Sequence, residues 1–372
     1  MEKIRVLMVL GNTGMGGSQA FVLNLLQNID LSRFHFDFVV NAEKPNGIGQ
    51  IVRELGSNIF VLPYFKVYNY YDYIKSWKEF LNSNHYDIIH GHSTNSASIY
   101  LKIGKEMGCS TIAHSHSGGY RGNYFQRLAK KYFAKKVAKV ADYWFACSDK
   151  AALRLFGEKY RDYPFYFDIP NAINVEKYKF NGSLRNKIRN EIGIKDDELL
   201  CGHVGTFSQP KNHSFLIEIF NEVLKRNAKA RLVCCGTGAL MSHVKEKAQS
   251  LGILDKIIFT GVVMNVNEFM MAMDVFVFPS IFEGFPMSVV ESEATGLPIV
   301  MSDVITSDVD IADLTHRKSL RESPSTWADA ICNITGGNRE KYNQVVVDSK
   351  YNIKTSVEMI TDLYIKMKCN KS

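Results

Sequence analysis

The sequence VFVFPSIFEGFPMSVVESEATGLP, residues 275–298, carries the pattern of one unit of an open α/β sheet. The apolar run Val275–Phe278 predicts a buried strand, and the polar loop after it leads into a predicted helix over Met287–Thr295. Gly296 ends that helix, because glycine favours the position after a helix C-terminus, and Pro298–Met301 predicts the next strand. A strand, a crossover helix and a second strand form the unit from which parallel sheets are built.

The same alternation extends over the whole chain in two series. The break lies in the proline- and aromatic-rich segment Tyr163–Asn174, after which the pattern restarts. We therefore predict an α/β protein with two doubly wound, Rossmann-like domains, residues 1–172 and 173–350, and a helical tail at 351–372. Such sheets bind ligands at the carboxyl ends of their strands, so we expect the domains to face each other across a central cleft that holds the site. The predicted strands are Ile4–Leu10, Phe36–Val40, Asn58–Leu62, Asp87–His90, Thr111–Ala113, Tyr143–Ala146, Leu199–Val204, Ala230–Cys235, Lys256–Phe259, Val275–Phe278 and Pro298–Met301, and the predicted helices include Ser18–Asn28, Tyr73–Asn82, Ser96–Met107 and Tyr124–Val140.

Composition and length indicate a globular protein in a reducing compartment. The chain has 372 residues, of which 46% are hydrophobic and 22% charged, which fits two ordinary domains and excludes a disordered chain. Its seven cysteines are odd in number and form no C-x-x-C pair, so neither a disulfide framework nor a zinc knuckle is expected. The N-terminus lacks a secretory signal pattern, and no apolar run reaches the ~18–20 residues that span a bilayer. We predict a cytoplasmic protein whose membrane contact, if any, is peripheral.

Two turns that precede helices are candidate anion sites. Gly14, Gly16 and Gly17 follow the first strand, where a glycine-rich turn exposes backbone N–H groups at a helix start. The G-x-G-x-x-G fingerprint fails because Gln19 stands at its third glycine, so this turn is either an anion site or only a tight turn. Lys211 stands beside a predicted helix start, where a cation is unfavourable unless an anion joins it, and a solvated surface lysine is the alternative.

A pair of glutamates marks the loop and helix after strand 275–278. Glu283 lies in the loop and Glu291 in the second turn of the helix, so both carboxylates can reach different groups of one extended ligand. The free N–H groups of residues 285–288 would face an anion between them. Helix capping and surface charge are the alternative reading of such a pair. Glu293 falls on another face of the helix and is predicted to be solvated.

These carboxylates, with Gly284 and Phe285, match the E-x7-E signature of the retaining glycosyltransferase family 4, which the chain resembles over nearly its whole length. The motifs that follow the family's order are Gly16-Gly17-Ser18, Pro170-Asn171-Ala172-Ile173-Asn174, Val204-Gly205, Lys211-Asn212, Gly236-Thr237-Gly238 and Phe259-Thr260-Gly261. The motifs similar to the branch that builds capsular and exopolysaccharides are Ala113-His114-Ser115-His116-Ser117, Lys211-Asn212-His213 and Ser323-Pro324-Ser325-Thr326-Trp327-Ala328.

The resemblance implies the GT-B fold, in which residues 1–172 bind the acceptor, residues 173–350 bind a nucleotide sugar, and the final helix in 351–372 crosses back onto the first domain. By similarity, Glu283 would bind hydroxyls of the donor sugar, Lys211 would neutralise the departing β-phosphate, and Glu291 would bind the ribose. The other positions that the resemblance assigns to donor binding are Gly16, Gly17, Gly205, Thr206, Gly236, Thr237, Gly238, Val266, Gly284, Phe285, Pro286 and Met287.

A histidine beside the donor sugar completes the implied catalytic set. His116 is favoured over His114, because the strand is expected to end near Ala113 and the later residue reaches further, and Asn171 is a further candidate contact. The alternative is that both histidines only line the crevice. The family commonly has arginine at the position of Thr206, and that loss could weaken phosphate binding by about 1.5–3 kcal/mol.

The implied reaction is transfer of a sugar from a nucleotide sugar, with UDP the expected nucleotide, to a saccharide acceptor with retained anomeric configuration. Electrostatic stabilisation of the leaving diphosphate requires no metal and no cofactor, and Asp308-Val309-Asp310 is predicted to be a surface turn rather than a metal site. The alternatives are a nucleotide-sugar epimerase of the same fold and, with less support, a nicotinamide-dependent oxidoreductase or a basic module that binds membranes or nucleic acid.

The positive charge of the chain is concentrated in its first half. Residues 1–172 carry 21 Lys+Arg and 14 Asp+Glu, which accounts for the whole net charge of +7. Seven cations and no acid lie in the stretch from Arg121 to Lys139, and six of these cations fall in the predicted amphipathic helix 124–140. This stretch is either a solvated face or a surface for anionic lipid and a lipid-linked acceptor on the inner face of the plasma membrane, with no role in binding nucleic acid. The cations assigned to that face are Arg127, Lys131, Lys135 and Lys139.

Overall fold

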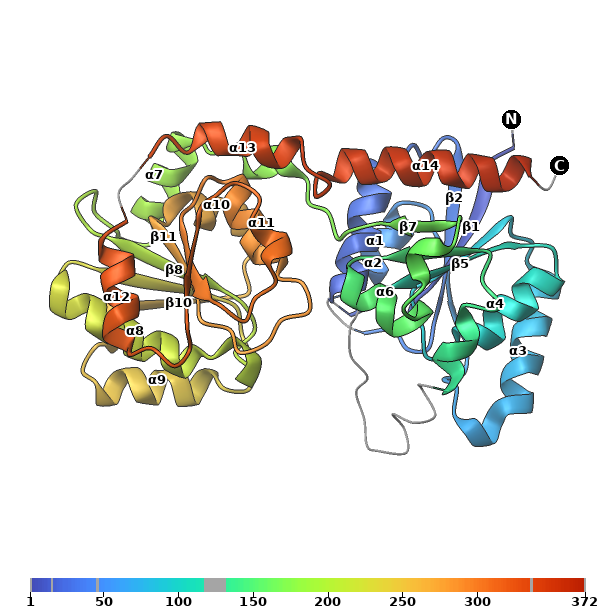
Figure 1. Ribbon diagram of the computed structural model, residues 1–372, viewed down its shortest axis with the longest axis horizontal. Helices are drawn as coiled ribbons and strands as arrows, with labels where there is room; N and C mark the ends of the chain where they lie inside the picture. The colour runs from blue at the N-terminus through green and yellow to red at the C-terminus, as the bar shows by residue number, and fades with distance from the viewer. Residues whose placement is uncertain (1, 15, 45–46, 117–131, 335–336, 371–372) are drawn as a thin grey trace. The chain divides into compact units, whose positions relative to one another are not determined.

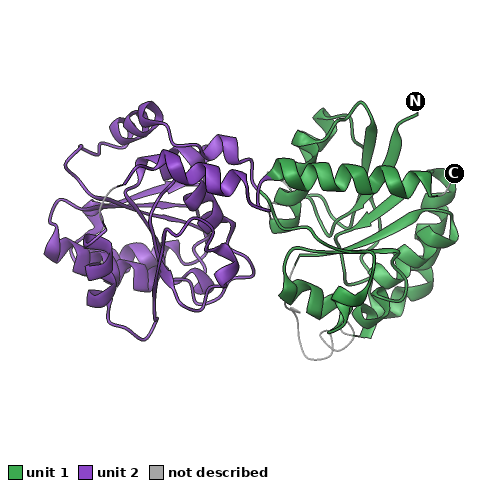
Figure 2. Cartoon of the chain, turned by 45° about the horizontal axis from the view of Figure 1, so that its top comes forward, with its two compact units in different colours: residues 1–172, 353–372 green, residues 173–352 purple. Residues whose placement is uncertain are grey.

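The computed structural model describes the chain except residues 1, 15, 45–46, 117–131, 335–336 and 371–372. It divides into two compact units, which Figure 2 colours separately. Unit 1 comprises residues 1–172 together with 353–372, and unit 2 comprises residues 173–352. None of the described helices has the length and apolar composition needed to cross a bilayer.

In the described part of unit 1, seven parallel strands form one sheet in the order β3-β2-β1-β4-β5-β6-β7 (Figure 1). Its central strands are buried along both faces, as continuous apolar runs predict. One face is covered by α1, α2 and α14 and the other by α3, α4 and α6. The bounds are β1 Ile4–Val9, β2 Phe34–Val40, β3 Ile59–Val61, β4 Ile88–Gly91, β5 Ser110–Ser115, β6 Tyr143–Ala146, β7 Tyr166–Asp168, α1 Gly17–Asn28, α2 Gly49–Glu54, α3 Tyr70–Ser83, α4 Ala97–Glu106, α6 Asp149–Phe156 and α14 Ile353–Cys369.

Unit 2 repeats this plan with six parallel strands among its described residues, in the order β10-β9-β8-β11-β12-β13. Helices α7, α10, α11 and α13 cover one face, and α8, α9 and α12 cover the other. The two sheets confirm the predicted pair of doubly wound α/β domains. The bounds are β8 Leu200–Val204, β9 Arg231–Cys235, β10 Ile257–Gly261, β11 Val275–Phe278, β12 Ile299–Ser302, β13 Thr315–Lys318, α7 Gly182–Glu191, α8 His213–Arg226, α9 Met241–Ser250, α10 Val266–Ala272, α11 Met287–Ala294, α12 Pro324–Cys332 and α13 Glu340–Val347.

Both sheets are wider than the sequence predicted, because each gains an edge strand. Strand β7 lies inside the segment Tyr163–Asn174 that was assigned to the junction, and β13 has the polar sequence Thr-His-Arg-Lys. A short edge strand buries little surface and lacks the apolar signature of a central strand. Strand β5 ends at Ser115 rather than near Ala113, which places His114 inside the strand.

The last helix, α14, belongs to unit 1, where it packs against α1 (Figure 1). The Tyr364 hydroxyl lies 2.6 Å from Nδ1 of His90, and the Lys368 ammonium pairs with Asp87. Of the predicted amphipathic helix at 124–140, residues 132–137 are helical, and the part before residue 132, with Arg127 and Lys131, lies outside the described residues.

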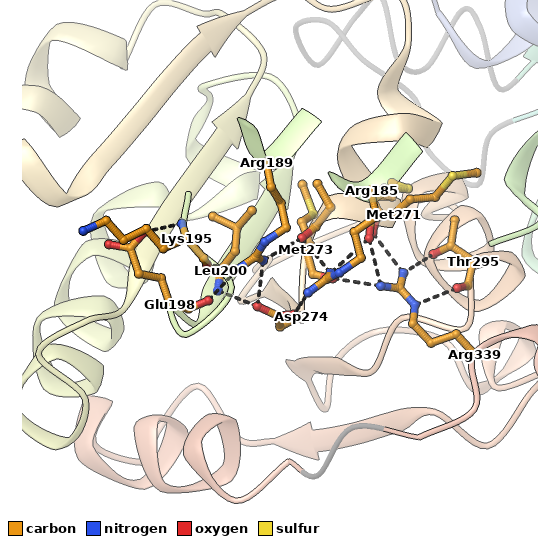
Figure 3. A network of polar contacts seen from close by, with 12 residues as sticks. Arg185, Arg189, Lys195, Glu198, Leu200, Met271, Met273, Asp274, Thr295 and Arg339 are labelled. Atoms are coloured by element: carbon orange, nitrogen blue, oxygen red, sulfur yellow. Dashed lines mark hydrogen bonds and ion pairs between the residues drawn. The ribbon is translucent and has the colours of Figure 1, made fainter. Parts of the chain in front are cut away.

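Three arginines join the helices of unit 2 around the C-terminal end of α10 (Figure 3). Arg185 and Arg189 both bind the carboxylate of Asp274, at 2.6 and 3.2 Å. With Arg339 they also donate to the last carbonyl oxygens of α10, which have no partner within the helix. The cations therefore stabilise the negative end of the helix dipole and hold α7, α10 and the segment before α13 together.

Candidate functional site

A lysine and a glutamate form an ion pair at the carboxyl edge of the sheet in unit 2. Lys211 ends the 3₁₀ helix Gln209–Lys211, which follows β8, and Glu283 lies in the loop after β11. Lysine Nζ lies 2.9 Å from Glu283 Oε1, and the side chains are only 19% and 15% exposed. The same ammonium lies 4.6 Å from the ring centroid of Phe278. The pair is shielded from water, so its electrostatic interaction is stronger than that of a surface pair.

The loop that carries Lys211 is fixed by its neighbours rather than by the ion pair alone. Asn212 has a left-handed backbone, with φ 55°, and its side-chain amide donates to the Pro279 carbonyl at 3.1 Å. The N–H of Ile281 donates to the Pro210 carbonyl at 2.7 Å. These bonds tie the turn after β8 to the turn after β11, which brings together residues that are far apart in the sequence.

The glycines assigned to donor binding have a packing role that the structure makes explicit. A Cβ atom on Gly236, whose φ is +138°, would lie 2.2 Å from the Gly205 carbonyl oxygen, and one on Gly238 would lie 2.5 Å from the Phe207 carbonyl oxygen. Only glycine allows these turns to approach so closely. Thr206, on the same edge, is exposed.

The second glutamate of the predicted pair is partly buried in the structure. Glu291 lies on α11, and the Tyr178 hydroxyl, from the 3₁₀ helix Val175–Tyr178, hydrogen-bonds its carboxylate. Burial raises the pKa of the Glu291 carboxyl. The bond from Tyr178 and the positive charge of the nearby Lys211 both lower this pKa and so offset part of the rise. Sequence reasoning did not identify Tyr178, because its role depends on a contact made across the fold.

The other predicted donor-binding residues of unit 2 lie around the ends of two helices. Pro286 is the N-cap of α11, Met287 is its first residue, and no side chain caps its free N–H groups. Phe285 stacks on Tyr351 with ring centroids 5.1 Å apart. Val266 begins α10. Residues 284–287 therefore form the end of the loop and the start of α11, and the stacking of Phe285 on Tyr351 holds this part of the loop in place.

Glu293 corrects the sequence prediction, because it is fully buried rather than solvated. Its carboxylate accepts the backbone N–H groups of Ile311 and Ala312 at 3.1–3.2 Å. Burial raises the pKa of this carboxyl to about 7. The helix is covered on more than one side, so the polar face that its pattern suggests is used for an internal contact. Asp310, in the predicted surface turn, is exposed and pairs with Arg317 at 2.9 Å.

Unit 1 contains a cluster of four histidines at the ends of β4 and β5. His90 Nε2 lies 3.0 Å from His114 Nδ1, and His92 Nδ1 lies 2.7 Å from His116 Nε2. The two hydrogen-bonded pairs lie one over the other, since ring centroids are 4.3 Å apart for His90 and His92 and 4.0 Å apart for His114 and His116. The pattern His-x-His at two adjacent strand ends could have indicated this cluster, but only His114 and His116 were predicted.

Both ring nitrogens of His116 have partners within unit 1. Beyond its bond to His92, Nδ1 lies 3.3 Å from Asn171 Oδ1, so a ligand would replace this longer contact. A Cβ atom on Gly17 would lie 3.9 Å from the Asn171 amide, and Gly16 is the extended N-cap of α1. The structure thus groups the glycine turn, Asn171 and His116.

The cluster has some features of a metal site, since ligand atoms of His90, His92 and His114 lie within 4.8 Å of one another. Both ring nitrogens of His90 already have partners, so a metal ion that binds this ring would have to displace Tyr364 or His114. Burial lowers the pKa of His116 to about 4 and those of the other three imidazoles well below their ordinary value. The cluster is therefore neutral near pH 7, and the absence of a metal stays a prediction.

Acid should destabilise unit 1 more than unit 2. The four buried imidazoles bind protons in the unfolded chain below about pH 6.5 but not in the folded protein, so their stability is complete above that pH and is lost as the pH falls toward 4. For His116, whose pKa falls to about 4, the loss should be about 1 kcal/mol at pH 5.5, and the other three imidazoles act in the same direction. In unit 2 the buried His203 and His213 act in the same direction. Glu293 opposes them, because its raised pKa makes the folded state bind a proton more readily than the unfolded chain, so the stability of unit 2 rises as the pH falls below 7.

Hydrogen exchange pulsed at one common pH, after incubation at about pH 7.5 or 5.5, should show this difference. We expect β4 and β5 peptides to lose protection at the lower pH well before β11 and β12 peptides. Equal protection of β4 and β5 after the two incubations would contradict the assignment of neutral, buried histidines.

Comparison with known proteins places this architecture in a family. The model of the group 1 glycosyl transferases matches residues 198–336, and the model of glycosyltransferase family 4 matches residues 15–177. The chain is 29% identical over 97% of its length, and 96% of the relative's, to EpsF of Bacillus subtilis, which is named as a glycosyltransferase. It is 25% identical, over 78% of each chain, to the UDP-Gal:α-D-GlcNAc-diphosphoundecaprenol α-1,3-galactosyltransferase of Escherichia coli.

Solved structures share the fold. A glycosyltransferase from Rickettsia africae superposes with a TM-score of 0.78 at 14% identity, covering 99% of both chains. The Anabaena protein Alr3699/HepE in complex with UDP gives a TM-score of 0.71 at 15% identity, covering 99% of this chain and 98% of that one. With the two family models and two Rossmann-like sheets, these findings show that the chain belongs to the group 1 glycosyltransferases of family 4 and has the two-domain GT-B fold.

Proposed function

We propose that the enzyme is a retaining hexosyl- or N-acetylhexosaminyltransferase that uses a UDP-sugar and extends a lipid-linked saccharide in capsular or exopolysaccharide synthesis. The observation that carries the proposal is the shielded Lys211–Glu283 pair, which supplies a cation for a diphosphate and a carboxylate for sugar hydroxyls at one point. The complex of the Anabaena protein with UDP supports the nucleotide, and the name of the E. coli relative, a diphosphoundecaprenol galactosyltransferase, supports the class of acceptor.

In the proposed reaction, unit 2 binds the donor and unit 1 binds the acceptor. The bond between the sugar C1 and the β-phosphate oxygen breaks, the acceptor hydroxyl oxygen bonds to C1 from the same face, and its proton passes to the departing phosphate. Lys211 stabilises the charge that develops on the leaving diphosphate, Glu283 orients the sugar, and Glu291 binds the ribose. We propose that His116 contacts the donor sugar and that the reaction requires no metal. The enzyme would act at the cytoplasmic face of the plasma membrane.

The proposal is tested with a panel of UDP-glucose, UDP-galactose and their N-acetylamino counterparts, each incubated with and without a lipid-linked acceptor extract. We expect one donor to give a glycosylated lipid product, by mass spectrometry, with the anomeric configuration of the donor by NMR. A product of inverted configuration would contradict the retaining mechanism. Conversion of the donor to another sugar in the acceptor-free arm would instead indicate an epimerase.

A further inference from the structure

Unit 1 contains a groove that the proposed transfer reaction does not use. A cavity of about 570 Å³ lies between α3, α4 and residues 132–140. Its apolar lining includes Ile99, Ile103 and Phe133, and the Phe133 ring packs edge-on against Phe65 at 5.1 Å between centroids. The floor of the groove is therefore a fixed apolar surface formed by α3, α4 and residues 132–140.

The rim of the groove is positively charged. Four lysines line it, whereas Glu106, which pairs with Lys102 at 3.7 Å, is its one acidic lining residue among those described. Lys78 and Lys139 form no ion pair with any described residue, and Lys136 lies over the Tyr132 ring at 4.2 Å. Ser98 also lines the groove, and 93% of its surface is buried. Its hydroxyl has no hydrogen-bond partner among the described residues. Unpaired cations and a buried free hydroxyl point to an anionic ligand.

Exposed aromatic side chains continue from the groove onto the surface. Tyr70 lines the groove, and its neighbours Tyr68 and Tyr71 are 83% and 85% exposed. Tyr132, next to the lining residue Phe133, is 58% exposed. Tyrosines and lysines at one surface are typical of a protein region that lies at the headgroup level of a bilayer.

We propose that this groove binds the headgroup of an anionic membrane phospholipid, with the phosphate among the lysines and the upper part of an acyl chain on the apolar floor. An apolar floor beneath a cationic rim is complementary to an amphiphile of that charge. The inference adds a lipid site to the membrane location in the proposed function, and it does not depend on the transfer reaction.

Flotation of the full chain with phosphatidylcholine vesicles, with or without phosphatidylglycerol, tests the site. We expect binding only where phosphatidylglycerol is present. The double variant K78E/K139E should lower the partition coefficient at least roughly tenfold, since each lysine near an anionic surface contributes about 1 kcal/mol. The matched control K75E/K159E makes the same change of charge at two unit 1 lysines that do not line the groove, and it should lose far less.

A third variant separates the groove from diffuse attraction between charges. Ile74 lines the groove, so I74W fills it without a change of charge and should also weaken binding. Equal losses in the two charge-reversed pairs, or wild-type binding by I74W, would overturn the proposal. Thermal unfolding checks that each variant is folded. Calorimetry with UDP serves as a separate readout, because failure of the wild type to bind UDP would count against the proposed function and leave the vesicle result intact.

Discussion

Replacing Glu283 by glutamine should lower sugar transfer at least about 100-fold and at the same time tighten the binding of UDP. The Glu283 carboxylate lies 2.9 Å from the Lys211 ammonium, in a position where both are largely shielded from water. A diphosphate that binds this lysine must compete with that carboxylate. Glutamine has the same shape but no charge, so it keeps a partner for sugar hydroxyls and removes the competitor.

The expected gain in UDP affinity is on the order of tenfold. In E283Q an unpaired ammonium that is largely shielded from water raises the free energy of the protein, and an anion that binds this ammonium lowers that free energy again. Isothermal titration calorimetry with UDP, which lacks the sugar that is transferred, measures this gain in affinity separately from transfer. The variant K211M should lose both UDP affinity and transfer. In contrast, E218Q removes the partner of Lys247 from another ion pair of unit 2 and should change neither.

If UDP binds E283Q no better than it binds the wild type, the ion pair does not compete with the diphosphate. If E283Q also transfers sugar at a near-normal rate, Glu283 is not part of the site. These two outcomes are independent, so the experiment tests the electrostatic argument and the site assignment separately.

The central strands were predictable because their apolar runs reflect burial on both faces of a sheet. Strand β11 has the bounds that its sequence predicted, Val275–Phe278. The edge strands β7 and β13 were not predictable, since pairing on one side leaves no apolar signature in Tyr166–Asp168 or Thr315–Lys318. Their positions depend on the neighbouring strands, which is information that a local pattern does not contain.

The site was predictable as a set of residues and not as a set of contacts. Motif order identified Lys211 and Glu283, but their ion pair depends on two turns that hydrogen bonds hold together. Likewise, His116 was a candidate for its position after a strand, whereas its bond to His92 requires the register of two parallel strands. Glu293 was misassigned because helical periodicity locates a face and does not reveal what covers it.

Replacing Arg339 by methionine should lower the stability of unit 2 by about 3–5 kcal/mol. Arg339 is partly buried, and this burial lowers the pKa of its guanidinium to about 9, with the nearby Arg185 adding to the effect. Its N–H groups donate to the carbonyl oxygens of Met271 and Thr295 at 3.0 and 2.9 Å, among others at the ends of α10 and α11 (Figure 3). Methionine fills much of the volume, but it removes the donor of the Thr295 carbonyl oxygen and leaves Met271 with only the longer bond from Arg185, at 3.2 Å.

The effect should be local, because the carbonyls that lose their donor terminate the helices that carry Val266 and Glu291. Hydrogen exchange should show lost protection in α10 and α11 and unchanged protection in β4 and β5 of unit 1. Arg226 provides a matched control, since its guanidinium also makes several hydrogen bonds but to exposed partners such as Asp329, and R226M should lower stability far less. A loss in R339M as small as that in R226M would mean that water reaches the freed carbonyls. UDP affinity should fall in R339M alone, because a loosened α11 no longer fixes the carboxylate of Glu291.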